Sequence, residues 1–494
     1  MSWLSRLIEP LKQSKPKPVA VGAFCASNLD TPLLSLSSAG DHFTLRHVVE
    51  GLSVMGAVGS GKTTGPLANI VLSLLGLGVG GVFFCAKQQE REWIESLARQ
   101  AGRSSSLLIV APDQPNRLNI LNYLAKRPGV VGSRIDQITE IFMRLARAGR
   151  RDSRHASSRE PFWDESLLKV VRNAVQIFTA ADEPLSASSL NRFIHSAATS
   201  HEQVHDRNWQ GSSYCYELIQ RGADRAETGE LNSVDRHDFE LAARFYLDEF
   251  ISFPDDTRRS VIATWSAAAD PLMRGTMAEL FGTTTTFVPE LAFDGALIVL
   301  DIPTNVYGEA GAAVQIAFKQ VLQLAVNSRK VRADTPVALI YADESHLLTS
   351  PDTDATFYST ARDKRIANIV ATQNLSNYLA KGGEGSRDAV EAMLGNLGFH
   401  IWCCNNHAAT NKWAAESIAN STTSRGTWNV NGQGESTGGA AQHNDPKVLE
   451  GVFTELQRGG PPSFMTEAIV FRSGHHFNQS GDTWLRVAFP QVID

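Results

Sequence analysis

The chain has 494 residues, of which 43% are apolar and 20% are charged, as in ordinary globular proteins. These values exclude disorder, collagen-like repeats and a small disulfide scaffold as the overall class, and the length corresponds to about two to four domains. The net charge of −6 provides no global basic field, so binding to nucleic acid would require a local patch or a pore.

The first 19 residues have the composition of a tail. They lack the long apolar core of a signal peptide, and the five cysteines of the chain form no C-x-x-C pair, so we expect a cytosolic protein without a disulfide framework or zinc site. Apolar residues between Trp3 and Leu11 share one side of a short helix, and the basic segment KQSKPKP follows. Two interpretations stay open, namely contact with a membrane surface or partner, and a frayed terminus.

A phosphate-binding loop follows the apolar segment Leu52–Met55, which we expect to be a buried strand. Its sequence, GAVGSGKT, matches the pattern G-x-x-x-x-G-K-[ST], in which backbone N–H groups surround phosphates, the lysine reaches the β and γ phosphates, and the hydroxyl binds Mg²⁺. We therefore assign ATP binding to Gly56, Ala57, Val58, Gly59, Ser60, Gly61, Lys62, Thr63 and Thr64.

The 24 residues between Lys62 and Lys87 carry no charge, which is enough to span a bilayer core of about 20 residues. The loop at their start favours another explanation. A helix over 64–76 would leave the phosphate loop, glycines at 76–81 would form a turn, and Val82–Cys85 would be the next buried parallel strand. We therefore expect no membrane helix here.

A second apolar run, from Val337 to Ala342, ends in two adjacent acids, as a buried strand does at its carboxyl edge. Together with the phosphate loop, this pattern predicts that Asp343 and Thr63 hold Mg²⁺ and that Glu344 polarises the attacking water. Lys62 and Glu344 are therefore predicted catalytic residues, with ATP and Mg²⁺ as cofactors.

A third short strand, over 366–372, ends at Gln373, where ring ATPases of the RecA type place a glutamine that senses the γ-phosphate. The alternative is a polar strand end. Between the acidic pair and this glutamine lie Arg362, our choice for a cation supplied to a neighbouring subunit, and Arg365, the reserve. A solvated basic loop is the alternative for both.

Residues 126–255 carry helical patterns and no convincing strand. Within them lies a cluster of arginines that could form a basic, sequence-independent DNA-binding rim in a ring, or an exposed loop between helices. Its members are Arg144, Arg147, Arg150, Arg151, Arg154 and Arg159.

The remaining chain returns to an α/β pattern. We expect a strand over 296–301, a helix over 311–327 and a closing hairpin from 467–472 and 484–489. A segment rich in Ser, Thr, Gly, Asn and Gln, residues 421–444, is predicted to be a mobile loop. The fold class is thus α/β, a RecA-like P-loop domain with an inserted all-α domain. The predicted boundaries are 1–19 for the tail, 20–125 and 256–494 for the two parts of the nucleotide-binding domain, and 126–255 for the helical domain.

Several segments in this order resemble the type IV secretion coupling proteins, the TraG/TraD-like conjugation ATPases related to the HerA/FtsK motors. The phosphate loop and ALIYADESHLL are similar to the two nucleotide motifs of that family. FFCAK resembles its second strand, in which Cys85-Ala86-Lys87 replaces Asp-Pro-Lys and keeps only the lysine. LNILNYL, FWDESLLKVV, DDTRRSVIATW, ANIVATQNLSNY and NNHAATNKWAAESIA are similar to later family segments. The usual pair of amino-terminal membrane helices is missing from this sequence.

The resemblance implies an ATP-hydrolysing DNA translocase that assembles as a homo-hexamer and couples DNA, or a relaxase or other DNA-bound cargo, to a secretion channel. It implies a cytoplasmic location, peripheral to the inner membrane through channel partners. Two alternatives stay open. One is a HerA/FtsK-like translocase in DNA processing or defence, and the other is a nucleotide-dependent docking platform with little turnover.

Overall fold

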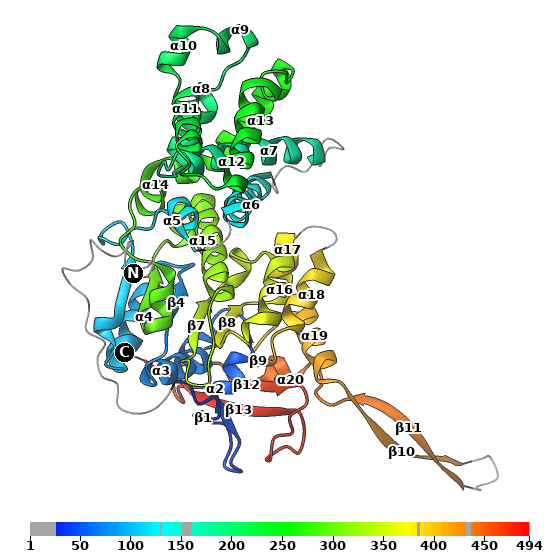
Figure 1. Ribbon diagram of the computed structural model, residues 1–494. Helices are drawn as coiled ribbons and strands as arrows, with labels where there is room; N and C mark the ends of the chain where they lie inside the picture. The colour runs from blue at the N-terminus through cyan, green and yellow to red at the C-terminus, as the bar shows by residue number, and fades with distance from the viewer. Residues whose placement is uncertain (1–25, 129–130, 151–159, 383–385, 431–435, 494) are drawn as a thin grey trace. The chain divides into compact units, whose positions relative to one another are not determined.

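The computed structural model describes residues 26–128, 131–150, 160–382, 386–430 and 436–493. They divide into two compact units, which are described separately (Figure 1). The sheet unit contains the described residues of 26–108, 291–299 and 326–493, and the helical unit those of 109–290 and 300–325. Within these described segments, no helix is both long and apolar enough to cross a membrane.

The sheet unit is built on nine strands in the order β13-β12-β9-β3-β8-β7-β4-β6-β5. Strand β3 pairs in parallel with β8 and β9, β7 pairs in parallel with β4 and β8, and β12 pairs antiparallel with β9 and β13. The strands are β3 (Leu52–Met55), β4 (Gly80–Phe84), β5 (Leu107–Val110), β6 (Leu297–Leu300), β7 (Ala338–Ala342), β8 (Ile366–Thr372), β9 (Phe399–Cys403), β12 (Met465–Arg472) and β13 (Trp484–Pro490).

The strands predicted for the nucleotide site are confirmed, and so is the closing hairpin. Every residue of β3, β4, β7 and β8 is buried, which explains their continuous apolar sequences. In their register Met55 lies beside Thr372, and Phe84 beside Ala342. The residues that follow these strands therefore meet at one edge of the sheet, here called the carboxyl edge; the opposite side is the amino edge.

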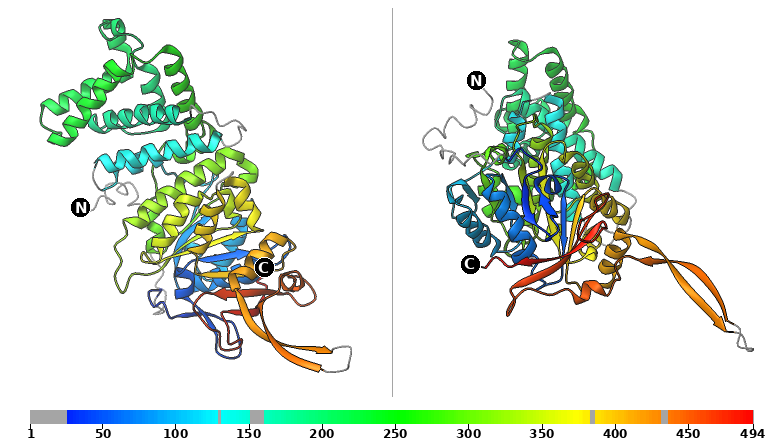
Figure 2. Two further views of the ribbon diagram at one scale, coloured as in Figure 1. Left: turned by 90° about the vertical axis from the view of Figure 1, so that its right-hand side faces the viewer. Right: turned by 90° about the horizontal axis from the view of Figure 1, so that it is seen from below.

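Two groups of helices flank the sheet (Figure 2). Helices α3 (Ala68–Gly76) and α4 (Glu90–Gln100) pack against each other. The other group has α16 (Pro351–Ala361), α17 (Leu375–Gly382), α18 (Ser386–Gly395) and α19 (Ala408–Ile418). The unit also contains β1 (Pro32–Ser35), β2 (His42–Thr44), α2 (Leu45–Val49), α20 (Val452–Glu455) and the short turns η2 (Thr63–Leu67), η3 (Ser104–Ser106), η6 (Pro289–Asp294) and η7 (Ser345–Leu347).

The uncharged segment after the phosphate loop forms η2, α3 and β4, as predicted, so a helix and a buried strand account for its hydropathy. The segment 421–444 differs from the predicted loop. Strands β10 (Asn420–Val430) and β11 (Ser436–Pro446) form an antiparallel ribbon that projects from the rest of the sheet unit (Figure 1). Its small and polar composition is typical of loops, but Thr422, Thr423, Thr427, Trp428 and Val430 favour extended backbone.

The helical unit begins where the chain leaves the sheet. An antiparallel bridge between Leu118 and Thr285 joins the start of its first long segment to the end of that segment. Its helices are α5 (Ile120–Lys126), α6 (Val131–Arg150), α7 (Glu160–Ala180), α8 (Ala187–Ser196), α9 (His201–Val204), α10 (Arg207–Ser212), α11 (Tyr214–Glu227), α12 (Ser233–Arg244), η4 (Phe245–Glu249), α13 (Asp255–Ala269), η5 (Asp270–Leu272), α14 (Gly275–Phe281) and most of α15 (Thr304–Asn327).

The helical region extends beyond the predicted boundary at residue 255. Helix α13, expected at the return to the α/β domain, packs on α6 and α7. The reason is its apolar face, on which Val261 and Trp265 are fully buried and the Trp265 ring lies 4.6 Å from that of Phe142.

Candidate nucleotide site

The phosphate loop lies at the carboxyl edge, between β3 and η2. Gly59 and Gly61 have φ values of +72° and +84°, which turn the chain tightly enough for its N–H groups to converge. A Cβ atom on Gly61 would stand 2.1 Å from the Thr466 Oγ1 atom, so a side chain is excluded there. Ser60 and Lys62 are buried, whereas Val58 is 73% exposed. The loop therefore has the backbone that phosphate binding requires.

The predicted metal-binding pair is brought together from distant parts of the sequence. The Thr63 hydroxyl donates to Asp343 Oδ2 at 3.2 Å, and Lys62 Nζ lies 3.5 Å from Asp343 Oδ1. A threonine hydroxyl and a buried carboxylate are the oxygen ligands that Mg²⁺ takes beside nucleotide phosphates. Lys62, Thr63 and Asp343 therefore fit a magnesium–triphosphate complex.

Glu344 directly follows Asp343 and has φ +47° and ψ +39°, a left-handed conformation that costs a non-glycine residue about 1–3 kcal/mol. Its carboxylate is 4% exposed. One oxygen, Oε1, accepts from the Lys87 ammonium and, at 3.1 Å, from the Gln373 amide. Burial raises the pKa of Glu344, but the Lys87 hydrogen bond and the Lys62 charge outweigh it and leave the pKa below its usual value. Glu344 is thus held ionised, as a base must be.

Gln373 directly follows β8, as the strand pattern suggested, and its side chain reaches Glu344. Its backbone carbonyl accepts from Asn405 Nδ2 at 2.9 Å, at the end of β9. The side chains of Lys62, Lys87, Asp343, Glu344 and Gln373 therefore come from four strand ends and converge on the acidic pair.

The two candidate arginines lie in the turn between α16 and β8, at the amino edge. The Arg362 side chain is 62% exposed and lies 3.8 Å from Glu50, which is bound mainly by Arg472 at 2.9 and 3.0 Å. Arg365 Nη1 instead donates to the Ser27 and Thr335 carbonyls. The site thus joins the predicted nucleotide-site residues except these two, which precede β8, whereas the phosphate loop lies beside the last residue of that strand.

Lys87, Glu90 and Gln491 also contribute to this edge, although sequence patterns did not identify them as site residues. Lys87 was noted only because it survives from the Asp-Pro-Lys segment. Glu90 is 7% exposed and accepts from the Ala86 N–H at 2.6 Å; burial, reinforced by Asp343, raises its pKa to about 8. The Gln491 amide donates to the Thr64 hydroxyl at 2.5 Å. The lysine kept from the Asp-Pro-Lys segment, three residues after the end of β4, was the available signal for Lys87; Glu90 and Gln491 left none.

The arginine cluster remains untested. Arg144, Arg147 and Arg150 lie in the final part of α6, where side chains are outside the description, and residues 151–159, with Arg151, Arg154 and Arg159, lie outside the described residues.

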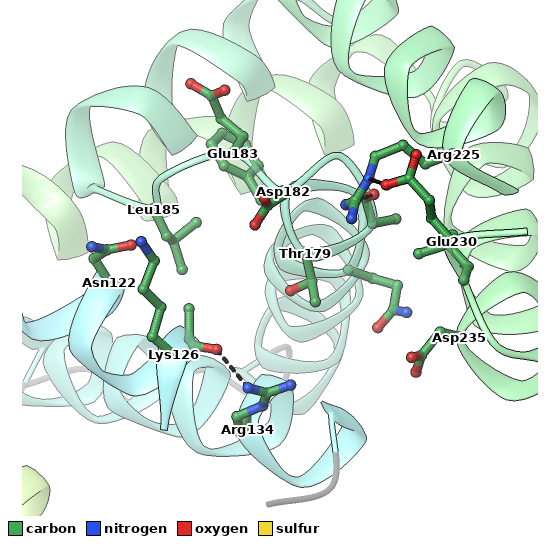
Figure 3. Close-up of a pocket in the computed structure, with 15 residues that line it drawn as sticks. Asn122, Lys126, Arg134, Thr179, Asp182, Glu183, Leu185, Arg225, Glu230 and Asp235 are labelled. Carbon is green, nitrogen blue, oxygen red and sulfur yellow. Dashed lines mark hydrogen bonds and ion pairs between the residues drawn. The ribbon is translucent and has the colours of Figure 1, made fainter. Parts of the chain in front are cut away.

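A separate pocket of about 530 Å³ occurs in the helical unit, and Figure 3 shows its lining. Arg225 Nε donates to Glu230 at 3.0 Å, and Arg134 Nη1 donates to the Ala125 carbonyl at 2.9 Å. Acidic and basic groups share this pocket, so it offers no single-sign surface for phosphate.

Comparisons with known proteins place this geometry on a known fold. No protein-family model and no curated protein matches the chain. Among solved structures, the bacterial conjugative coupling protein TrwBdeltaN70 in its unbound monoclinic form is 14% identical, with a TM-score of 0.56, covering 95% of this chain and 91% of that chain. The plasmid coupling protein TrwB with the non-hydrolysable ATP analogue ADPNP is 13% identical, with a TM-score of 0.55 and coverages of 96% and 93%. TrwB with ADP and Mg²⁺ is 12% identical, with a TM-score of 0.54 and coverages of 96% and 92%.

These likenesses confirm the predicted fold class, an α/β RecA-like domain with an all-α domain. The predicted resemblance to coupling proteins is confirmed at the level of the fold, across nearly the whole chain.

Proposed function

We propose that this chain is a coupling-type ATPase, a nucleotide-driven motor that moves DNA or a DNA-bound protein toward a secretion channel. The observation that carries the proposal is the convergence of Lys62, Thr63, Asp343, Glu344 and Gln373 at one sheet edge. It is supported by the fold shared with TrwB, which has been solved with ADPNP and with ADP and Mg²⁺.

Each residue has a distinct task in the proposed hydrolysis. The N–H groups of 59–63 and the Lys62 ammonium would bind the phosphates, and Thr63 and Asp343 would hold Mg²⁺, whose positive charge would offset that of the phosphates. Glu344 accepts hydrogen bonding from the attacking water and orients it toward the γ-phosphorus. Gln373 donates to Glu344 and accepts from Asn405 beyond β9, and through these contacts it would report the presence of the γ-phosphate.

Ring assembly is part of the proposal because Arg362, the candidate arginine finger, lies at the amino edge, whereas the phosphate loop of the same chain lies at the carboxyl edge. Arg362 is exposed at the amino edge and would complete the site of a neighbouring subunit in a homo-hexamer. DNA would pass through the ring with sequence-independent phosphate contacts, for which Arg144, Arg147, Arg150, Arg151 and Arg154 are candidates. We place the motor in the cytoplasm, peripheral to the inner membrane through channel partners, with a relaxase or other DNA-bound protein as its cargo.

The test is ATP turnover by the purified chain without DNA and with single- or double-stranded DNA, followed by particle imaging of the same sample. We expect DNA-stimulated hydrolysis by rings, and Lys62→Ala should abolish it. Undiminished hydrolysis in Lys62→Ala would refute the site. Tight ATP-dependent binding of cargo without turnover would replace the motor with a docking platform.

A further inference from the structure

Lys87 stands out among the side chains around Glu344 because it comes from a strand that contributes nothing else to the proposed chemistry. It lies three residues beyond the end of β4, the parallel neighbour of β7, with Phe84 beside Ala342. This register brings the turn after β4 to the turn that carries Glu344. The Lys87 ammonium then binds Glu344 Oε1, although 257 residues separate the two in sequence.

The backbone of Lys87 is held by hydrogen bonds to Glu90. Glu90, the first residue of α4, accepts hydrogen bonds through Oε2 from the N–H groups of Ala86, at 2.6 Å, and Lys87, at 3.3 Å. Since Glu90 is 7% exposed and sits on a helix packed against α3, this turn has little freedom. The lysine is therefore presented to Glu344 from a rigid base.

The two oxygens of the Glu344 carboxylate have different surroundings. Oε1 accepts from both Lys87 and Gln373. Oε2 is buried, accepts no hydrogen bond from any described residue, and lies 3.7 Å from His346 Nδ1. A base needs one oxygen fixed and the other not already taken by a protein donor, and the contacts of Oε1 and Oε2 with the described residues make that division.

We propose that Lys87 is a positioning residue for the hydrolysis proposed above: by holding Oε1 of Glu344, it presents Oε2 to the attacking water. The inference rests on the proposed ATPase function. The lysine touches neither phosphate nor water in this role and acts only through Glu344. The left-handed backbone at Glu344 adds to the need for such a restraint, because a strained conformation persists only where its surroundings hold it.

The role predicts a specific kinetic pattern. Lys87→Ala and Lys87→Met should lower kcat by about ten- to a hundredfold, the size expected when a catalytic group is misplaced by about 1 Å. The KM for ATP should stay within about threefold, because the phosphate loop is untouched. Lys87→Arg should recover part of kcat. The Lys87 side chain is 48% exposed, so methylammonium added to Lys87→Ala should also restore part of it.

A matched control is Lys412→Met on α19, which removes a lysine 3.9 Å from the exposed Glu416 and should leave kcat unchanged. Thermal unfolding and ADPNP binding measured on every variant identify any that fail to fold; Lys87→Met keeps the aliphatic stem for that reason. The inference is overturned if Lys87→Met folds, binds ADPNP and turns over like the unaltered chain, or if its loss appears in KM alone.

Failure of the proposed function looks different. In that case the unaltered chain shows neither ADPNP binding nor turnover, and the role of Lys87 falls with it. If turnover is present and abolished by Lys62→Ala but insensitive to Lys87, only the positioning role is wrong.

Discussion

The two edges of the sheet differ in how their charged side chains are buried and paired. At the carboxyl edge, Asp343 and Glu344 are nearly inaccessible and bind lysines from other strands. At the amino edge, one buried carboxylate, Glu50, is occupied by Arg472, while Arg362 stays 62% exposed. The carboxyl edge therefore contains what a chain can supply to its own nucleotide, and the amino edge contains what it could offer to another chain.

The strongest way to break this comparison is to remove Arg362. Arg362→Ala should lower ATP turnover by about a thousandfold or more in assembled rings, as expected for an arginine finger. The measurement is turnover of mixtures with Lys62→Ala, since an intact site forms where an unaltered Arg362 faces an unaltered phosphate loop. Recovery of activity on mixing supports action between chains. No loss in Arg362→Ala would mean that the amino edge takes no part.

Glu344→Gln tests the other edge. It keeps the size of the side chain but removes the charge that Lys87 and the attacking water require, so kcat should fall by about a hundredfold or more with ADPNP affinity nearly unchanged. Single-turnover hydrolysis and equilibrium binding separate the two quantities. A variant with weakened binding and an unchanged hydrolysis rate would show that Glu344 serves the metal site and not the water.

At the amino edge, Glu50→Gln should affect stability before activity. The substitution replaces the charged partner of Arg472 by a neutral amide. In the present pair the Glu50 side chain is 8% exposed and the Arg472 side chain 19%. We expect about 2 kcal/mol of destabilisation, below the 3–5 kcal/mol of a fully buried pair. Thermal unfolding measures it. Arg387→Ala, which breaks an exposed pair with Glu391 on α18, is the control and should change little.

Acid should weaken the amino edge through His47 in α2. Burial, followed by the charges of Arg472, His475 and Arg46, lowers the pKa of His47 to about 3. In the unfolded chain His47 has a pKa of about 6.5 and binds a proton at pH values where His47 of the folded chain stays neutral. The free energy of unfolding is therefore highest above pH 6.5 and falls between pH 6.5 and 3 by up to about 1.4 kcal/mol per pH unit. His47→Gln should reduce this slope in unfolding midpoints measured from pH 7.5 to 5. An unchanged slope would assign the sensitivity to other groups.

The sequence predicted which strand ends carry the phosphate loop and the acidic pair, because a phosphate loop requires glycines, a lysine and a hydroxyl at fixed spacing. Asp343 and Gln373 were found because each ends an apolar strand. The contact between Lys87 and Glu344 could not be predicted, since it depends on the register of β4 against β7 and not on local pattern. The ion pair of Glu50 and Arg472 could not be predicted for the same reason, since the two residues are 422 positions apart in the sequence.

The errors also have physical causes. Composition predicted a loop over 421–444, but backbone pairing between β10 and β11 does not need apolar side chains. The boundary at 255 was placed too early because α13 belongs to the helical unit through its packing. The contact of Trp265 with Phe142 in α6 is made in three dimensions and cannot be deduced from the sequence of α13.

The place of β3 in the sheet has a consequence for biosynthesis. Both of its neighbours, β8 and β9, come from much later in the chain, and Ile366 follows Met55 by about 310 residues. At about 5–20 residues per second, a ribosome needs roughly 15–60 seconds to supply the first of them. During that interval the phosphate loop emerges attached to an apolar strand with neither edge paired. We expect the nascent chain to depend on chaperones, and shortened chains that end before β8 to aggregate.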